Sequence, residues 1–285
     1  MNATDSTRTA LVTGAGSGIG KAVARKLASI GSRLVLVDVD PRGLESTVEE
    51  LAHTDVLPVS GDIAEEATMD EAVAAGAERF GQIDQYHLNA GIMGSFDPFP
   101  LLQVEDFDRV MSVNVRGTFL GLRAAFRQYA RQDTAGSIVV TASIASLRGS
   151  ADVIAYQTSK HAGLGLIRAA AMYGGPLGIR TNGVAPGLVP TELHTAAAQR
   201  AGGGGDIFER GRTVPMRRTG SASEVAEVVS FLLSDAASYV NGEVVSVDGG
   251  SATMSSVRPS GGAGRWDSAE VDMPARDASE QLRRR

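Results

Sequence analysis

Three residues in the middle of the chain carry side chains suited to proton transfer. Tyr156 and Lys160 are four positions apart, so on a helix both side chains project from one face. Ser143 precedes Tyr156 by 13 residues. Tyrosine titrates near 10, and a nearby ammonium favours the phenolate and lowers that value. The pair therefore predicts an acid–base device in which Tyr156 exchanges a proton with a substrate.

A glycine-rich segment near the N-terminus suits a different chemistry. It reads Thr-Gly-Ala-Gly-Ser-Gly-Ile-Gly over residues 13–20 and lies between an expected strand and an expected helix. Such a turn must bring backbone N–H groups and a helix N-terminus against a pyrophosphate, and only glycine allows the dihedral angles and the close approach. Because the order strand, turn, helix is the one that phosphate binding requires, we expect a dinucleotide cofactor rather than a plain flexible turn.

Asp38 ends the second expected strand, where the residue that holds the adenosine ribose is expected. A carboxylate there accepts hydrogen bonds from the ribose hydroxyls and repels a 2′-phosphate, so NAD is predicted in preference to NADP. No basic residue occupies positions 15–19, and Lys21 and Arg42 are read as surface residues. The alternative is that Asp38 is a helix N-cap or a turn aspartate, a role that Asp40 can also fill.

Short apolar segments alternate with segments of helical periodicity along the first 250 residues. Strands are expected over residues 9–13, 33–37, 56–59, 85–88, 136–141, 179–184 and 243–247. Helices are expected over residues 21–30, 41–52, 65–80, 105–131, 155–173 and 224–233. This alternation predicts an α/β fold, a Rossmann-like doubly wound parallel sheet with helices on both faces. We see no linker before residue 250, so residues 1–250 are predicted to form a single domain.

The composition excludes several classes of protein. Lys and Arg number 27 and Asp and Glu 33, a net charge of −6 that argues against nucleic-acid binding. The absence of cysteine excludes disulfides and a thiol nucleophile, and the four scattered histidines predict no metal site. No apolar run approaches the roughly 20 residues of a membrane span, and the N-terminus has no secretory apolar core. A cytoplasmic protein without a membrane partner is therefore expected.

Residues 251–285 differ from the rest in being rich in Ser, Gly, Pro and charged side chains. This composition predicts a polar, flexible tail rather than part of the folded domain. The three arginines at positions 283–285 are either a solvated end or a contact for an anionic partner.

Taken together, these motifs resemble those of the short-chain dehydrogenase/reductase family over roughly residues 7–250, in order and in spacing. The glycine segment resembles the family's cofactor turn, and Asn89-Ala90-Gly91 resembles the end of its Asn-Asn-Ala-Gly element. The further matching segments are Asp62-Ile63, Asn114 within Asn-Val-Arg-Gly, Ser143, Tyr156 with Lys160, Pro186 to Thr191, and Asp248-Gly249-Gly250. Leu88, preceded by His87, departs from the family, which usually has asparagine at the position of Leu88.

The resemblance implies a catalytic set of Asn114, Ser143, Tyr156 and Lys160. Tyr156 would exchange the hydroxyl proton, Lys160 would lower its pKa and bind the nicotinamide ribose, and Ser143 would orient the substrate oxygen. Asn114 would hold a water that links Lys160 to solvent. The cofactor-binding residues that the resemblance implies are Gly14, Ser17, Gly18, Ile19, Gly20, Asp38, Asp62, Ile63, Asn89, Tyr156, Lys160, Pro186, Val189 and Thr191. It also implies a homotetramer.

The substrate side is predicted from two segments. Residues 92–96 should border the pocket, and residues 188–215 should form a lid with a hinge or a disordered tip at Gly202 to Gly205. The alternative for residues 188–215 is a slack surface loop. His194 and Arg148 are read first as a solvated lid residue and a surface ion pair, and alternatively as substrate contacts.

The function that this reading predicts is hydride transfer between NAD(H) and a small secondary alcohol or ketone, with Tyr156 as general acid or base. An NADPH-dependent 3-oxoacyl-thioester ketoreductase is the alternative enzyme, and Asp38 argues against it. A non-catalytic dinucleotide-binding regulator is the alternative of another class, and the complete catalytic set argues against it.

Overall fold

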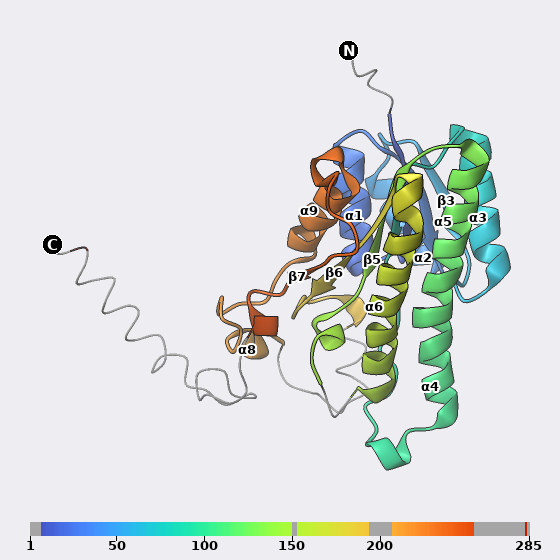
Figure 1. Ribbon diagram of the computed structural model, residues 1–285. Coiled ribbons are helices and arrows are strands. Elements are labelled where there is room, and N and C mark those ends of the chain that lie inside the picture. Colours follow the sequence, from blue (N-terminus) through green and yellow to red (C-terminus); the bar gives the residue numbers. More distant parts are fainter. Residues whose placement is uncertain (1–6, 150–152, 194–206, 254–282, 284–285) are drawn as a thin grey trace.

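The computed structural model describes residues 7–149, 153–193, 207–253 and 283, and is shown in Figure 1. These residues form a seven-stranded parallel sheet with the strand order β3-β2-β1-β4-β5-β6-β7. The strands are β1 (Thr9–Thr13), β2 (Arg33–Asp38), β3 (Val56–Ser60), β4 (Gln85–Leu88), β5 (Gly136–Thr141), β6 (Ile179–Pro186) and β7 (Val244–Val247).

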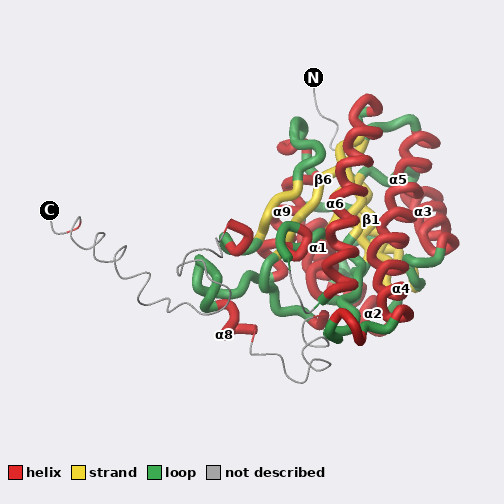
Figure 2. Tube along the Cα trace, turned by 60° about the horizontal axis from the view of Figure 1, so that its bottom comes forward, coloured by secondary structure: helices red, strands yellow, loops and turns green. Residues whose placement is uncertain are grey.

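Helices cover both faces of the sheet, as Figures 1 and 2 show. One face packs against α1 (Gly18–Ser29), α2 (Pro41–Glu50) and α9 (Ala222–Leu233). The other packs against α3 (Glu66–Phe80), α5 (Thr118–Gln132) and α6 (Ile154–Gly174). Helix α4 (Val104–Met111) leads toward α5 on this second face and packs beside α6, as Figure 1 shows, and the short helix α8 (Ile207–Gly211) borders the cavity described below.

Alternation of side chains along the strands creates two separate cores. Leu11 and Val35 point to the core beneath α3, α5 and α6, whereas Val12 and Leu36 point to the core beneath α1, α2 and α9. All four are fully buried. Burying each such side chain contributes about 1.5–3 kcal/mol, so a sheet that is apolar on both faces requires helices on both.

The predicted fold class is confirmed, and the predicted element boundaries agree to within a few residues. The largest shift is in α1, which begins at Gly18 rather than at residue 21, because the glycine turn runs directly into the first helical turn. The long helix predicted over residues 105–131 is α4 followed by a π-helical segment, Ser112–Gly117, and then α5.

The sheet order places a crevice at one defined point. After β1 the chain moves outward to β2 and β3, and it then returns to the other side of β1 with β4. Between β1 and β4 the neighbouring crossovers therefore run in opposite directions, and such a switch point leaves a crevice at the carboxyl ends of the strands. The glycine turn follows β1 and Asn89 follows β4, so both lie at this crevice.

Several predictions concern residues outside the described part of the chain. These are the hinge at Gly202 to Gly205, His194, and most of the tail, since the description stops at Thr253 except for Arg283. None of the described helices combines the length and apolarity needed to cross a lipid bilayer.

Candidate active site

A cavity of about 710 Å³ opens at the carboxyl ends of the central strands. It brings together every site residue expected from the sequence except Gly20 and Asn114. The expected residues that line it are Gly14, Ser17, Gly18, Ile19, Asp38, Asp62, Ile63, Asn89, Ser143, Tyr156, Lys160, Pro186, Val189 and Thr191. Residues from both halves of the chain thus converge on one space.

The glycine turn has the geometry that a pyrophosphate site requires. Gly14 and Gly18 have φ values of +67° and +50°, a region that other residues rarely adopt. Gly20 lies behind the turn, where an added Cβ would stand 1.9 Å from the carbonyl oxygen of Gly14. Ser17 is the N-cap of α1, but its side chain makes no capping hydrogen bond, and the first turn holds no acidic residue. The helix N-terminus is therefore open to an anion in the cavity.

The Asp38 carboxylate is fixed at the rim of the same cavity. Its Oδ2 accepts a hydrogen bond from Gly16 N at 2.7 Å, and its Oδ1 accepts one from Asp40 N at 2.9 Å. Asp40 caps α2, accepting from Arg42 N at 3.1 Å, so Asp38 is not the cap, whereas the bond that Asp38 accepts from Asp40 N is that of a turn aspartate. The Asp38 carboxylate also lines the cavity, where it can accept hydrogen bonds from a hydroxyl-bearing ligand. The glycine turn, the open helix end and this carboxylate together fit a dinucleotide.

Ser143, Tyr156 and Lys160 meet on the opposite side of the cavity. Ser143 follows β5, and its Oγ accepts a hydrogen bond from Ala145 N at 3.1 Å, which fixes the side chain. Tyr156 and Lys160 lie one turn apart on α6, and each is 8% exposed. The Lys160 Nζ donates to the carbonyl oxygen of Thr141 at 2.8 Å and stands 5.5 Å from the centre of the Tyr156 ring.

Burial sets the protonation of this pair. It raises the pKa of Tyr156, and a hydrogen bond with the Ser143 side chain opposes that rise. Burial also lowers the pKa of Lys160 to about 8. The net direction of the Tyr156 pKa is therefore opposite to the expected fall, because low-dielectric surroundings disfavour the phenolate; that Lys160 lowers this pKa stays a prediction. A raised pKa favours the protonated form of Tyr156, which is the form that donates.

Asn114 lies next to the cavity rather than in its wall. Its Oδ1 accepts from Ile92 N, and its Nδ2 donates to Ile92 O, both at 2.8 Å. The Nδ2 group also donates to Ser159 Oγ at 2.9 Å, one residue before Lys160. A Cβ on Gly91 would lie 3.1 Å from the Asn114 Oδ1 and 3.7 Å from the Lys160 Nζ, so glycine leaves room for both. Asn114 thus ties the segment after β4 to α6, and its water-holding role stays a prediction.

A buried polar chain that the motifs did not reveal connects the strands to the glycine turn. His87 Nε2 lies 2.9 Å from Thr141 Oγ1, which donates to Asn89 Oδ1 at 3.0 Å. Asn89 Nδ2 donates in turn to Gly14 O at 3.4 Å. Because the Thr141 hydroxyl proton is used toward Asn89, Nε2 of His87 must carry the proton that it donates. Leu88, where the family has asparagine, is buried in the apolar core.

The half of the cavity beyond the proton-transfer residues has apolar walls and arginines. Met93 and Phe96 line it, as expected from the sequence. Arg109 and Val113 line it as well and were not expected. They are four positions apart on α4 and the π segment, and this spacing, which puts two side chains on one helical face, is the signal that could have found them. Among the described residues, no group of His, Asp and Glu is arranged to bind a metal.

With this geometry in hand, comparison with known proteins is informative. A family profile described as enoyl-(acyl carrier protein) reductase matches residues 14–252. Levodione reductase from Leifsonia aquatica is 40% identical over 255 residues, covering 85% of this chain and 93% of the relative. The 2-(R)-hydroxypropyl-CoM dehydrogenase of Xanthobacter autotrophicus is 39% identical over 247 residues, covering 85% and 97%. The crystal structure of NAD⁺-bound xylitol dehydrogenase superposes with a TM-score of 0.81 at 33% identity, covering 86% of this chain and 100% of the other.

Fold and cavity define a nicotinamide-dependent oxidoreductase with a doubly wound sheet. The chain belongs to the short-chain dehydrogenase/reductase family. This confirms the family, the fold and the class of reaction expected from the sequence, hydride transfer that involves a secondary alcohol or ketone.

Proposed function

We propose that this protein is an NAD(H)-dependent dehydrogenase or reductase of a small secondary alcohol or ketone. The observation that carries the proposal is the convergence on one cavity of an uncapped helix N-terminus, the Asp38 carboxylate and the Ser143, Tyr156 and Lys160 side chains. Fixed placement of a cofactor site beside a proton donor is what hydride transfer requires of a protein.

The roles of the chain's own residues follow from their contacts. A bound nicotinamide dinucleotide supplies or takes up the hydride. A hydrogen bond from the Ser143 side chain opposes the rise in the Tyr156 pKa, so the two hydroxyls lie close enough together to bind one substrate oxygen. In reduction Tyr156 donates its proton to that oxygen, and in oxidation it accepts the proton of the alcohol. Lys160 is held by Thr141 O beneath the tyrosine and supplies positive charge as the phenolate forms.

We infer NAD rather than NADP from the surroundings of Asp38. Two backbone N–H groups fix its carboxylate at the rim, where a 2′-phosphate would be repelled. Lys21, one of the nearest cations along the chain, forms an ion pair with Glu50 at 2.7 Å, so its charge is already neutralised and does not favour a 2′-phosphate. The same carboxylate argues against the NADPH-dependent thioester ketoreductase, and the buried Tyr156 and Lys160 argue against a non-catalytic regulator.

Further proposals concern the division of the chain into domains, its oligomeric state and its location. We infer that residues 1–250 are the catalytic domain and residues 251–285 a separate tail, which the profile match ending at residue 252 supports. We also infer a homotetramer, for which the exposed apolar surface is discussed below. The cytoplasmic location stays a prediction from the sequence.

The proposal is tested with a panel of secondary alcohols and ketones, each assayed with both nucleotides by the absorbance of the reduced nicotinamide. We expect turnover with NAD(H) and a lower kcat/KM with NADP(H). Asp38→Ala combined with Val39→Arg should narrow that difference, whereas Asp40→Ala, which removes only the cap of α2, should not. Equal use of both nucleotides by the unmodified protein would contradict the cofactor assignment, and no turnover on any member would contradict the reaction.

A further inference from the structure

We infer that the substrate carries an anionic group, which Arg148 and Arg210 bind at the far end of the cavity from Asp38. This inference rests on the proposed function and deepens it, since it names a substrate class: oxo acids and hydroxy acids, or their phosphate and sulfonate counterparts.

The first observation is the distribution of charge along the cavity. Its only carboxylates among the described lining residues are Asp38 and Asp62, both in the half assigned to the cofactor. The substrate half contains Arg109, Arg148 and Arg210 and no described acidic side chain. In a protein with a net charge of −6, three guanidinium groups around one end of a cavity produce a local field that attracts anions.

The second observation is that two of these guanidinium groups have no protein carboxylate as partner. Arg109 pairs with Asp106 at 3.0 Å, but within the described residues no carboxylate pairs with Arg148 or Arg210. The interpretation of Arg148 as one half of a surface ion pair is therefore not supported. Arg148 is partly buried and Arg210 is exposed, and both line the cavity, where a guanidinium gains most from a bidentate carboxylate or phosphate group.

The third observation is that both arginines stand on braced segments. The carbonyl oxygen of Arg148 accepts a hydrogen bond from Gln157 Nε2 at 2.5 Å, and Gln157 directly follows Tyr156. The backbone from which the Arg148 side chain projects is thereby tied to the residue next to the proton donor.

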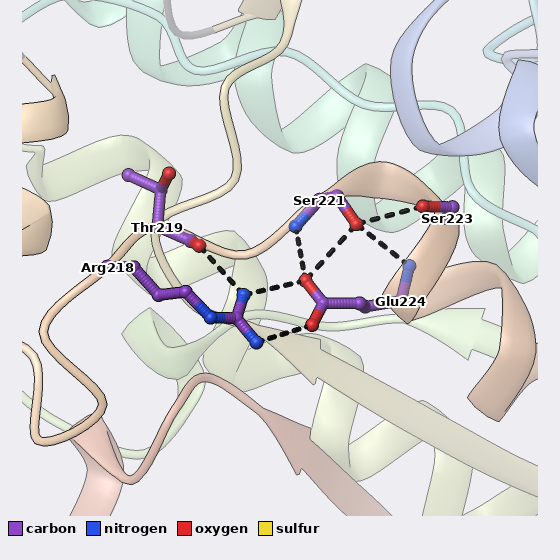
Figure 3. Close-up of polar contacts among 5 residues, drawn as sticks. All are labelled: Arg218, Thr219, Ser221, Ser223 and Glu224. Atoms are coloured by element: carbon purple, nitrogen blue, oxygen red, sulfur yellow. Dashed lines mark hydrogen bonds and ion pairs between the residues drawn. The ribbon is translucent and has the colours of Figure 1, made fainter.

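Arg210 lies on α8, which ends at Gly211. Figure 3 shows the ion pair between Arg218 and Glu224 in the segment that follows. Gly211 lies so close to Thr219 that an added Cβ would be 2.8 Å from Thr219 N. The neighbouring Arg218 binds both carboxylate oxygens of Glu224, at 3.0 and 2.7 Å, and this ion pair lowers the pKa of Glu224 to about 2. Glu224 also accepts from Ser221 N at 2.8 Å in the capping box of α9. The base of α8 is thus fastened to the N-terminus of a core helix.

The remaining walls suit the rest of such a substrate. Met93, Phe96 and Leu193 offer apolar contacts between the proton-transfer residues and the arginines. The substrate class that fits is a ketone or secondary alcohol whose short apolar body ends in a carboxylate, phosphate or sulfonate.

The test compares acids with their own neutral esters. Acetoacetate and levulinate are assayed beside methyl acetoacetate and methyl levulinate, with NADH, in the full-length protein and in Arg148→Gln and Arg210→Gln. Arg212→Gln is the matched control, because Arg212 lies beside α8, pairs with Glu209 at 3.5 Å and does not line the cavity.

We expect the unmodified protein to prefer an acid over its ester, mainly through KM. Each cavity variant should lower kcat/KM for the acid about tenfold or more, which matches the loss of one charge-assisted hydrogen bond. The ester and the affinity for NADH should change little in all variants. Equal use of acid and ester overturns the inference. Weaker NADH binding in the cavity variants also overturns it, because the arginines would then bind the cofactor's phosphates.

Failure of the proposed function is distinguished from failure of this inference by calorimetry. If no ketone is turned over, levulinate is titrated into the protein saturated with NAD⁺. Binding that is lost in Arg148→Gln and retained in Arg212→Gln supports the anion site without any turnover. Levulinate that binds no better than its methyl ester overturns the site.

Discussion

At the scale of single residues, burial of the proton-transfer pair opposes charge on both side chains. Tyr156 and Lys160 are equally buried, and burial disfavours the phenolate and the ammonium alike. The Lys160 Nζ group donates a hydrogen bond of 2.8 Å to the carbonyl oxygen of Thr141. Because only one carbonyl among the described residues compensates for its burial, Lys160 lowers the stability of the fold at this position beneath the tyrosine.

Replacing Tyr156 by phenylalanine should abolish turnover while the fold and NAD binding remain. Phenylalanine keeps the ring packed on α6 but removes the hydroxyl, so activity should fall by about 10²–10⁴-fold. Turnover on a verified substrate and cofactor titration measure the two effects separately. Near-normal turnover in this variant would make Tyr156 the wrong proton carrier.

The direction of the pH dependence follows from the raised pKa of Tyr156. The hydroxyl stays protonated through neutral pH, so ketone reduction should be constant there and decline only in alkaline solution. Alcohol oxidation needs Tyr156 without its hydroxyl proton, so its rate should rise with pH from neutral into alkaline solution. Profiles of kcat/KM in both directions test this, and a reduction rate that falls between pH 6 and about 8 would contradict it.

His87 should make the protein less stable in mild acid. Burial lowers its pKa to about 3, whereas an unfolded histidine titrates near 6.5. Between these values the unfolded chain binds a proton that the folded chain does not, so stability is lost as the pH falls below about 6.5. This group alone should lower the free energy of unfolding by about 2 kcal/mol between pH 6.5 and 5.

Denaturant unfolding of His87→Gln at several pH values measures that contribution. Glutamine can still donate a hydrogen bond toward Thr141 but does not titrate, so the slope against pH should be shallower than in the unmodified protein. His53, which is exposed, provides the control, and His53→Gln should leave the slope unchanged. Equal slopes for both variants would show that His87 does not control the acid response.

Most of the site could be predicted at this scale because its residues follow strand ends in a fixed order. What could not be predicted depends on contacts between distant segments. Thr141 carries no motif, yet its hydroxyl and carbonyl connect His87 with Lys160. The raised pKa of Tyr156 is another such property, because it follows from burial, which residue spacing does not give.

At the scale of elements, the glycine turn shows how a local sequence fixes a site. A side chain on Gly20 would lie 1.9 Å from the carbonyl oxygen of Gly14, too close for any rotamer to relieve. Gly20→Ala should therefore displace the turn, weaken NAD binding at least tenfold and destabilise the fold by about 1–3 kcal/mol.

Cofactor titration and denaturant unfolding check this prediction. Gly165→Ala serves as the control, because Gly165 is an exposed glycine of α6 with no atom within 4 Å of an added Cβ. This change should leave NAD binding intact. If both alanine variants bound NAD normally, close packing of the turn would not be what selects glycine.

Apolar periodicity predicted the strands and long helices because each must bury a face. It could not predict the π segment at Ser112–Gly117, because six residues are too few to distinguish a π-helical period from an α-helical one. Nor did it find α8, since five residues are too few to show a helical period. Both short elements contribute side chains to the cavity wall, and neither is long enough to bury an apolar face of its own.

At the scale of the whole molecule, the sheet that the structure describes has two edge strands, β3 and β7. Strand β7 has a neighbour on one side only, and an unpaired strand edge invites association with another chain. Beside it, Asn241 Nδ2 donates to Ala171 O at 3.0 Å and holds the loop before β7 against the end of α6. Around this contact three large apolar side chains are exposed: Met172 at 80%, Tyr173 at 66% and Tyr239 fully.

This surface predicts that copies of the chain associate through the end of α6 and the β7 edge. Exposed apolar residues that cluster beside an open strand edge are typical of an interface rather than of a solvated face. Light scattering should give a mass of about four times the 29.6 kDa of one chain. Tyr239→Glu and Met172→Glu should lower that mass, because each would place an unpaired charge in the interface. Ile30→Glu, which changes a comparably exposed apolar residue after α1, should not. A mass of one chain for the unmodified protein would refute the association, and a mass that all three variants leave unchanged would place the interface elsewhere.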